Sequence, residues 1–276
     1  MIQDIEPYRL DSGYLDIGPE EQDRILCFHG DRIVARLNAG RLLFPTGKDM
    51  VGTQCPRMVY AFQAAGQRFF LSLEEPEIPA DCSVFSLREL RTIRLQGNLD
   101  IFIVYTAYHL WKWYDTSRFC GRCGGRTEIA HDERAMICPA CGNRVYPRIN
   151  SAVIVGVKNH DRLLITRYKG NHAMNALVAG FTEIGETAEQ TVSREVMEEV
   201  GLRVKNIRYY KSQPWGIAAD LLTGFYCEVD GDDTIHLDSR ELGYAEWVSR
   251  KEIVLQPSDH SLTNEMMKMF RDGKEL

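Results

Sequence analysis

Two short stretches of this 276-residue chain concentrate side chains that bind metals. One holds four cysteines as two Cys-x2-Cys pairs, and the other, residues 180–202, holds six glutamates and a single arginine. Thiolates suit zinc, whereas hard carboxylate oxygens suit Mg2+ or Mn2+. The two stretches therefore predict two metal sites of different chemistry.

The cysteine stretch reads FCGRCGGRTEIAHDERAMICPACGNRVYP, with fourteen residues between the two pairs. Each pair forms a tight turn that presents two thiolates to one centre, and the glycines after the cysteines permit the positive φ that such turns need. Four ligands leave no open coordination position, so we expect a structural zinc ribbon rather than a redox pair. The expected ligands are Cys120, Cys123, Cys138 and Cys141. A ribbon can also bind nucleic acid, which Arg118, Arg122, Arg126 and Arg144 would favour.

The glutamate-rich stretch has the periodicity of an amphipathic helix. Three carboxylates, those of Glu195, Glu198 and Glu199, share an arc of roughly 100° on such a helix. Like charges at this spacing destabilise a helix, and Arg194 offsets only part of the repulsion. Divalent cations would supply the missing positive charge, and the alternative is an ordinary solvated acidic face. The apolar face that would pack on a sheet consists of Ala188, Val192, Val196 and Val200.

The complete spacing of the stretch identifies a family resemblance. It reads Gly180-x5-Glu186-x7-Arg194-Glu195-Val196-x-Glu198-Glu199-x-Gly201-Leu202, which resembles the Nudix box at every defined position. Nudix hydrolases cleave a nucleoside diphosphate linked to another group, within an α/β/α sandwich. The resemblance implies that Glu199 positions or deprotonates the attacking water. It implies Mg2+ or Mn2+ contacts from Glu195, Glu198, Glu199, Glu241 and the backbone oxygen of Ala179.

Features outside the box resemble one branch of that family, the NADH pyrophosphatases, which also remove NAD caps from RNA. A zinc ribbon directly before the Nudix domain, behind an N-terminal β domain, is the layout of this branch. The segments YPR (146–148), LVAGFTEIGET (177–187) and KNIRYYKSQPW (205–215) are similar to it. The resemblance implies that Phe181 stacks on the nicotinamide ring and that Tyr146 forms a wall of the pocket. Gln213, Trp215 and Asp220 would lie along the substrate.

One segment departs from the branch. After Gln-Pro-Trp the branch continues with Pro-Phe-Pro and, two positions on, a serine, whereas this chain has GIAA and then Asp220. Tyr244 also replaces an acidic residue of the branch. ADP-ribose or another nucleoside diphosphate derivative therefore stays open as the substrate. A non-catalytic dinucleotide sensor or regulator stays open as a different class of function.

The element pattern predicts a mixed α/β (α+β) architecture in four parts. We expect an antiparallel β-rich domain (1–97) with hairpins around Gly30 and Gly66, and a connecting helix (98–115) with Asn98 as its N-cap. The zinc ribbon (116–147) and the Nudix sandwich (148–276) follow. The first domain is expected to serve as a scaffold or dimerisation surface, or to contact the substrate.

Composition limits the partners and the cellular compartment that we expect for the protein. A net charge of -6 argues against binding along a nucleic-acid backbone, although it does not exclude recognition of one RNA end. We find neither a signal peptide nor a membrane span, and the four remaining cysteines are scattered. We therefore expect a reduced, cytoplasmic homodimer that acts on NADH or NAD+, and on NAD-capped RNA. The scattered cysteines are Cys27, Cys55, Cys82 and Cys227.

Overall fold

The computed structural model describes residues 1–50, 57–75, 77–170 and 174–275. The chain divides into two compact units, one of residues 1–2, 149–215 and 220–276, and the other of residues 3–148 and 216–219. Cys55 lies outside the described residues, and the seven described cysteines are all free of disulfides. Within the described part of the chain, no helix is both long and apolar enough to cross a membrane.

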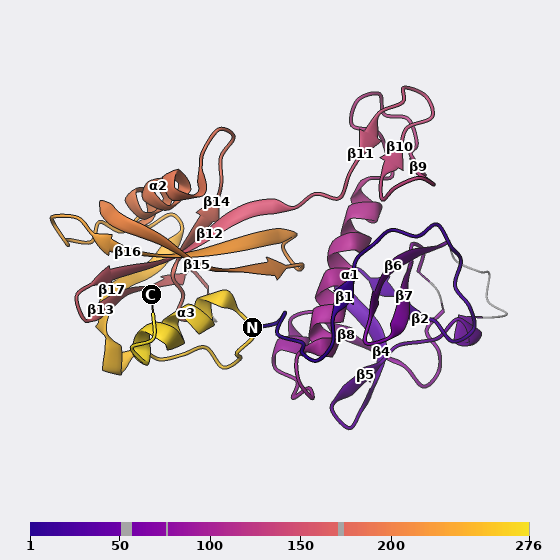
Figure 1. Cartoon of the computed structure of the whole chain (residues 1–276), viewed down its shortest axis with the longest axis horizontal. Coiled ribbons are helices and arrows are strands. Elements are labelled where there is room, and N and C mark those ends of the chain that lie inside the picture. Colours follow the sequence, from indigo (N-terminus) through magenta and orange to yellow (C-terminus); the bar gives the residue numbers. More distant parts are fainter. Residues whose placement is uncertain (51–56, 76, 171–173, 276) are drawn as a thin grey trace. The chain divides into compact units, whose positions relative to one another are not determined.

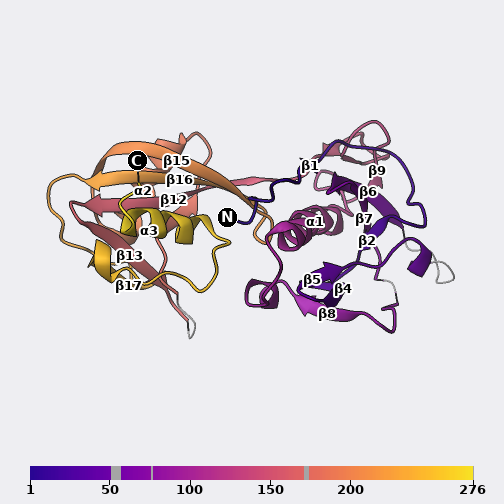
Figure 2. The ribbon, with the colours of Figure 1, turned by 60° about the horizontal axis from the view of Figure 1, so that its bottom comes forward.

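The unit that contains residues 3–148 combines small β-sheets with one long helix (Figure 2). One sheet has the order β1-β6-β7-β2, and another has the order β3-β4-β5 with β8 paired to β4. Short 3₁₀ helices span Lys48–Met50 and Glu89–Arg91. The strands are β1 Leu10–Asp11, β2 Arg24–Leu26, β3 Phe28–His29, β4 Arg32–Asn38, β5 Arg41–Leu43, β6 Met58–Ala64, β7 Gln67–Ser72 and β8 Ser83–Ser86.

The two predicted hairpins are confirmed in this unit. β3 pairs antiparallel with β4, and β6 with β7, with Gly30 and Gly66 in the turns at φ of 60° and 73°. The described strands of this domain pair mostly antiparallel, as predicted, and the exception is β2, which runs parallel to β7. The long connection between these two strands leaves the chain free to return in the same direction.

The connecting helix, α1 (Leu99–Thr116), is fixed by polar contacts at its first turn. Asp100 is 2% exposed and accepts hydrogen bonds from the Arg41 guanidinium at 2.9 and 3.0 Å and from the Leu42 backbone N–H at 2.8 Å. Asn98 occupies the N-cap position, but its side chain does not cap the helix as predicted. Its amide donates instead to the Asp4 carbonyl at 3.2 Å, which ties the helix start to the N-terminal segment.

The cysteine-rich segment after α1 forms a three-stranded sheet in the order β11-β10-β9. Its strands are β9 Glu128–Ile129, β10 Met136–Ile137 and β11 Arg144–Val145. Strands of two residues bury little apolar surface, so this segment depends on a cross-link or a bound ion to hold its shape.

The unit that contains residues 149–215 and 220–276 is built on one mixed sheet (Figure 1). Its order is β15-β16-β12-β13-β17, with β14 paired to β12, and β12 runs parallel to β16. A 3₁₀ helix spans Arg250–Glu252. The elements are β12 Asn150–Asn159, β13 Arg162–Tyr168, β14 Val178–Phe181, α2 Ala188–Val200, β15 Val204–Trp215, β16 Asp220–Val229, β17 Leu242–Ser249 and α3 Leu262–Arg271.

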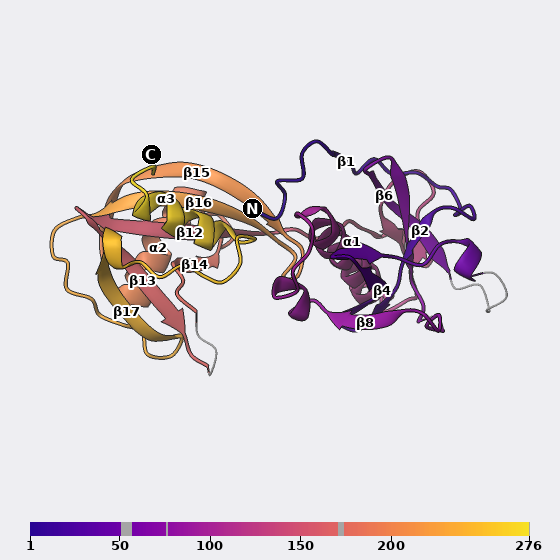
Figure 3. The ribbon, with the colours of Figure 1, turned by 90° about the horizontal axis from the view of Figure 1, so that it is seen from below.

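The alternation of side chains along β12 places one helix on each face of this sheet. Val153, Val155 and Val157 are completely buried in the core under α2, whereas Ile154 faces the core under α3. Each buried valine contributes roughly 1.5 to 3 kcal/mol through the hydrophobic effect. Figures 1 and 3 show α2 and α3 on opposite sides of the sheet. The predicted α/β/α sandwich is therefore confirmed.

Gln213 fastens β15 to the start of α3. It is 0% exposed, its amide nitrogen donates to the His260 carbonyl at 2.8 Å, and its amide oxygen accepts from the Leu262 N–H at 2.7 Å. A buried amide with both ends bonded in this way has a structural role.

We expect Gln213→Met to lower the free energy of unfolding by about 1 to 3 kcal/mol, because it removes two buried hydrogen bonds at nearly constant volume. Urea denaturation measures the change, with Gln63→Met on an exposed strand position as the control. An unchanged midpoint for Gln213→Met would contradict the structural role.

Candidate active site

Local signals at both ends fix the register of α2. The Thr187 hydroxyl accepts a hydrogen bond from the Gln190 N–H at 3.3 Å, and the Gln190 side chain accepts one from the Thr187 N–H at 2.8 Å, which makes a capping box. Gly201 ends the helix at φ 70°, in the left-handed conformation that glycine adopts without strain. This register turns Glu195 and Glu199, one helical turn apart, inward beside the valines.

Glu199 is a buried carboxyl group that no cationic side chain of the described residues compensates. Glu199 is only 3% exposed, and neither carboxylate oxygen has a hydrogen-bond partner among the described residues. Burial, followed by repulsion from Glu195 and Glu241, raises the pKa of Glu199 to about 8, and the Ala179 amide opposes this with a smaller effect. An unpaired buried carboxylate is costly unless a cation joins it.

Glu195 lies directly beneath β14. A Cβ atom on Gly180 would stand only 1.9 Å from the carboxyl carbon of Glu195, so a side chain at position 180 would displace this carboxylate. Burial raises the pKa of Glu195, while Arg194 acts in the opposite direction. The first glycine of the motif is therefore required for the close approach of strand and carboxylate.

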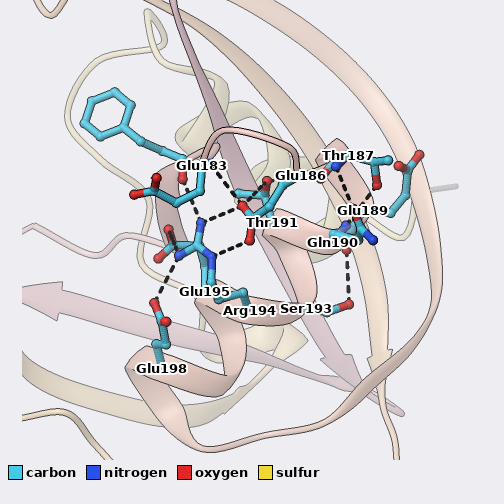
Figure 4. A network of polar contacts seen from close by, with 11 residues as sticks. Glu183, Glu186, Thr187, Glu189, Gln190, Thr191, Ser193, Arg194, Glu195 and Glu198 are labelled. Carbon is cyan, nitrogen blue, oxygen red and sulfur yellow. Dashed lines mark hydrogen bonds and ion pairs between the residues drawn. The ribbon is translucent and has the colours of Figure 1, made fainter.

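Arg194 binds three carboxylates of the motif at once (Figure 4). Its guanidinium donates to Glu186 at 2.7 and 2.9 Å, to Glu195 at 2.8 Å and to Glu198 at 3.0 Å. Helical spacing predicted that Arg194 offsets only part of the repulsion, and the structure shows that it reaches three carboxylates at once. None of its hydrogen bonds goes to Glu199, so the uncompensated charge remains there.

Glu241 approaches the same place from the segment before β17. It is exposed, and it lies near enough to Glu199 to raise the pKa of that carboxyl. The backbone N–H of Asp238 also donates to the Glu199 carbonyl at 2.9 Å, which holds this segment against the end of α2. Residues far apart in sequence are thus brought together around Glu199.

Sequence reasoning missed Tyr168, the last residue of β13. Its hydroxyl lies 3.5 Å from the Ala179 carbonyl oxygen. Burial, followed by the charges of Glu199, Glu241 and Glu195, raises the pKa of Tyr168, so the phenol keeps its proton at neutral pH. No sequence pattern indicated this residue, because its position depends on the pairing of Tyr168 with Leu242, the residue after Glu241.

The donor set of this site fits a hard divalent cation. It offers carboxylate and carbonyl oxygens, which are the ligands of Mg2+ and Mn2+, and it includes a buried carboxylate that lacks a partner. Its oxygens are less tightly gathered than the cysteine sulfurs, which form the one group of three or more ligand atoms within 4.8 Å of one another in the described ranges.

The expected substrate residues are distributed differently. Phe181 ends β14 with 55% of its surface exposed, and its backbone oxygen accepts a hydrogen bond from Arg194 at 2.8 Å, beside the carboxylates. Tyr146 is 52% exposed in the other unit, where its hydroxyl donates to Glu133 at 3.0 Å.

Gln213, Trp215 and Asp220 lie at the paired ends of β15 and β16. Asp220 is 7% exposed and accepts from the Asn150 amide at 3.3 Å. Gln213 was expected to lie along the substrate, but its buried amide is committed to the start of α3 instead. The structure thus brings Phe181, and not Gln213, to the carboxylates.

The four cysteines of the ribbon form the second site. Their sulfurs all lie within 4.8 Å of one another, with Cys120 and Cys141 at 3.7 Å and Cys123 and Cys138 at 3.5 Å. A tetrahedral zinc with Zn–S bonds of about 2.3 Å places sulfurs at roughly this separation. Gly124 and Gly142, at φ of 75° and 71°, donate from their N–H to the Cys120 and Cys138 carbonyls and close the two turns. The residues therefore fit a structural zinc ion.

The arginines of the ribbon are only partly available for nucleic acid. Arg144 pairs with Asp132 at 3.0 Å and with Glu133 at 2.5 Å, and Arg118 pairs with Asp115. Arg122 and Arg126 have no ion-pair partner within the part of the chain that the structure describes. Pairing leaves the ribbon less basic than its sequence indicates.

Comparisons with known families agree with these two sites. Residues 147–270 match the family described as NUDIX domain, and residues 115–146 match the NADH pyrophosphatase zinc ribbon domain. The first match spans the glutamates and the second spans the cysteines.

Named relatives and solved structures are similar to the same region. NAD-capped RNA hydrolase NudC of Shigella flexneri is 36% identical over 173 residues, which are 61% of this chain and 67% of that protein. NAD-capped RNA hydrolase NudC of Salmonella typhi is 40% identical over 149 residues, 54% of this chain and 58% of that protein. A NUDIX hydrolase from Nitrosomonas europaea covers 57% of this chain and 92% of its own at a TM-score of 0.50 and 22% identity, which supports the fold alone.

Loss of the ribbon's ion should unfold residues 116–147 selectively, because their two-residue strands cannot hold the segment by themselves. We expect Cys138→Ser to lose bound zinc, measured by elemental analysis, and to become sensitive to proteases within the ribbon. Cys82→Ser, outside the cluster, is the control and should keep both properties. Unchanged proteolysis in zinc-free Cys138→Ser would contradict this view.

Glu199 should make the protein less stable as the pH rises when Mg2+ and Mn2+ are absent. Its folded pKa of about 8 lies above the unfolded value, so the folded state binds the proton more tightly and loses free energy of unfolding between about pH 4.5 and pH 8. At pH 8.5 we expect Glu199→Gln to exceed the parent protein by roughly 3 to 5 kcal/mol in free energy of unfolding. Denaturation at pH 5 and 8.5 measures this, and a lower stability of the variant at pH 8.5 would disprove it.

Proposed function

This chain belongs to the Nudix hydrolase family, and we propose that it hydrolyses the diphosphate bond of NAD(H) to give nicotinamide mononucleotide and AMP. The proposal includes RNA 5' ends that carry an NAD cap. It is supported by the match to the NADH pyrophosphatase zinc ribbon domain and by relatives named NAD-capped RNA hydrolase. The observation that carries it is the buried, unpaired carboxylate of Glu199.

The protein's part in the reaction is to hold oxygen ligands and orient a water molecule. Bound Mg2+ or Mn2+ would polarise the phosphoryl oxygens and lower the pKa of a bound water. Glu199 positions or deprotonates that water, since its oxygens are free of other partners. Arg194 holds Glu195 and Glu198 in place through its hydrogen bonds. The proposed ligands are Glu195, Glu198, Glu199, Glu241 and the Ala179 carbonyl oxygen.

The exposed ring of Phe181 is proposed to stack on the nicotinamide. Phe181 follows Ala179 and Gly180 along β14, so a base lying on its ring stays near the strand that covers Glu195. Trp215 and Asp220 are proposed as further contacts of the dinucleotide. In the family branch a serine takes the place of Asp220, and the carboxylate here disfavours substrates with additional negative charge at that point.

The remaining parts are proposed to stabilise the enzyme. Zinc at the four cysteines holds the ribbon, and the β-rich residues 1–97 form a scaffold that supports a homodimer. We propose a cytoplasmic enzyme, in keeping with the free cysteines.

Product analysis with purified enzyme tests the substrate. NADH, NAD+, ADP-ribose, a dinucleoside polyphosphate and NAD-capped RNA are each supplied with Mg2+ or Mn2+. We expect NADH to yield nicotinamide mononucleotide and AMP at the highest kcat/KM among the free nucleotides. Much faster cleavage of ADP-ribose would overturn the proposal that NAD(H) is the substrate. Binding of these nucleotides without cleavage would favour a sensor.

The same assay tests the role of Glu199. Glu199→Gln should reduce kcat at least about 100-fold with an intact fold, because it removes the carboxylate that handles the water. Glu189→Gln, an exposed glutamate in the first turn of the same helix, should keep normal activity. Near-normal turnover of Glu199→Gln would remove the basis for this site.

A further inference from the structure

Tyr168 enters the carboxylate site because the pairing of β13 and β17 is irregular. Arg167 pairs with Tyr244, whereas the next residue, Tyr168, pairs with Leu242, so one residue of β17 is left over between them. Such bulges redirect side chains and are common beside active sites. Here the hydroxyl of Tyr168 comes to lie 3.5 Å from the Ala179 carbonyl oxygen.

The phenol hydroxyl adds a neutral hydrogen-bond donor to a site made mostly of acceptors. Its surroundings are acceptors: the Ala179 carbonyl and the carboxylates of Glu195, Glu199 and Glu241. Its hydroxyl is a hydrogen-bond donor at neutral pH, because the ordinary pKa of a tyrosine is about 10. The residue is still 41% exposed, which leaves it accessible from solvent.

Arg194 is not free to serve as this donor. Arg194 is bound to Glu186, Glu195 and Glu198, and its remaining contact is the Phe181 carbonyl. A diphosphate held over the carboxylates by divalent cations would therefore meet a neutral donor at Tyr168. Unlike a lysine, a tyrosine at this point does not compete with the cations for the carboxylates.

We propose that Tyr168 donates a hydrogen bond to a non-bridging oxygen of the diphosphate. This hydrogen bond becomes stronger as negative charge builds up on the oxygen in the transition state. Tyr168 keeps its proton throughout and forms no covalent bond. This inference rests on the proposed function and adds a catalytic residue to it.

Tyr168→Phe tests the inference because it removes the hydroxyl and keeps the ring. We expect kcat for NADH to fall about tenfold to 100-fold, with a much smaller change in KM, since the contact is strongest in the transition state. The Mn2+ dissociation constant, measured by electron paramagnetic resonance, and the melting temperature should not change. The shape of the pH profile should also persist, because the phenol does not titrate in the assay range.

Tyr209→Phe is the matched control, since Tyr209 is 53% exposed on β15 of the same unit and lies outside the proposed site. An unchanged kcat in Tyr168→Phe would overturn the inference and leave the proposed function standing. A weakened Mn2+ affinity would also overturn it, because Tyr168 would then act by holding Ala179. If the parent enzyme cleaves another nucleoside diphosphate derivative instead of NADH, the substrate proposal fails. The kcat values of Tyr168→Phe and the parent enzyme are then compared with that compound.

Discussion

The architecture around the active site depends on one constraint: Glu199 keeps a carboxylate in a place where water is excluded and no side chain neutralises it. Glu195 and Glu241 add further negative charge nearby. Such an arrangement lowers the stability of the empty protein, and it persists only if the surrounding structure holds it or a cation joins it. The neighbouring elements of the unit hold the carboxylates in place, and they leave Glu199 able to bind a cation.

Packing, capping and the choice of small residues together hold the charges in place. The valines of α2 bury one face of the helix against β12, and the capping box at Thr187 sets where the helical turns fall. Gly180 lets β14 lie on Glu195, and Arg194 pairs with three other glutamates while leaving Glu199 free. Each glutamate of the motif therefore has its own environment, although Glu195, Glu198 and Glu199 share one helix.

Features encoded by short spacing could be predicted from the sequence, and features created by distant contacts could not. The α2 helix, the hairpins at Gly30 and Gly66 and the cysteine cluster follow from local patterns. Strand β15 was not predicted because it lies at the edge of its sheet, is mostly exposed and carries two irregularities that break its alternation. Burial of Gln213 and the position of Tyr168 depend on α3 and on the β17 bulge, which no local pattern reveals.

The central claim is that the unpaired charge at Glu199 exists to bind divalent cations. Crystals soaked in Mn2+ and measured at the manganese absorption edge test it directly, because anomalous scattering locates the ion without reference to activity. We predict a manganese peak in direct coordination with a Glu199 oxygen and with Glu195 or Glu241. Peaks confined to exposed glutamates such as Glu183 and Glu189, with Glu199 left protonated and without a ligand, would contradict the account.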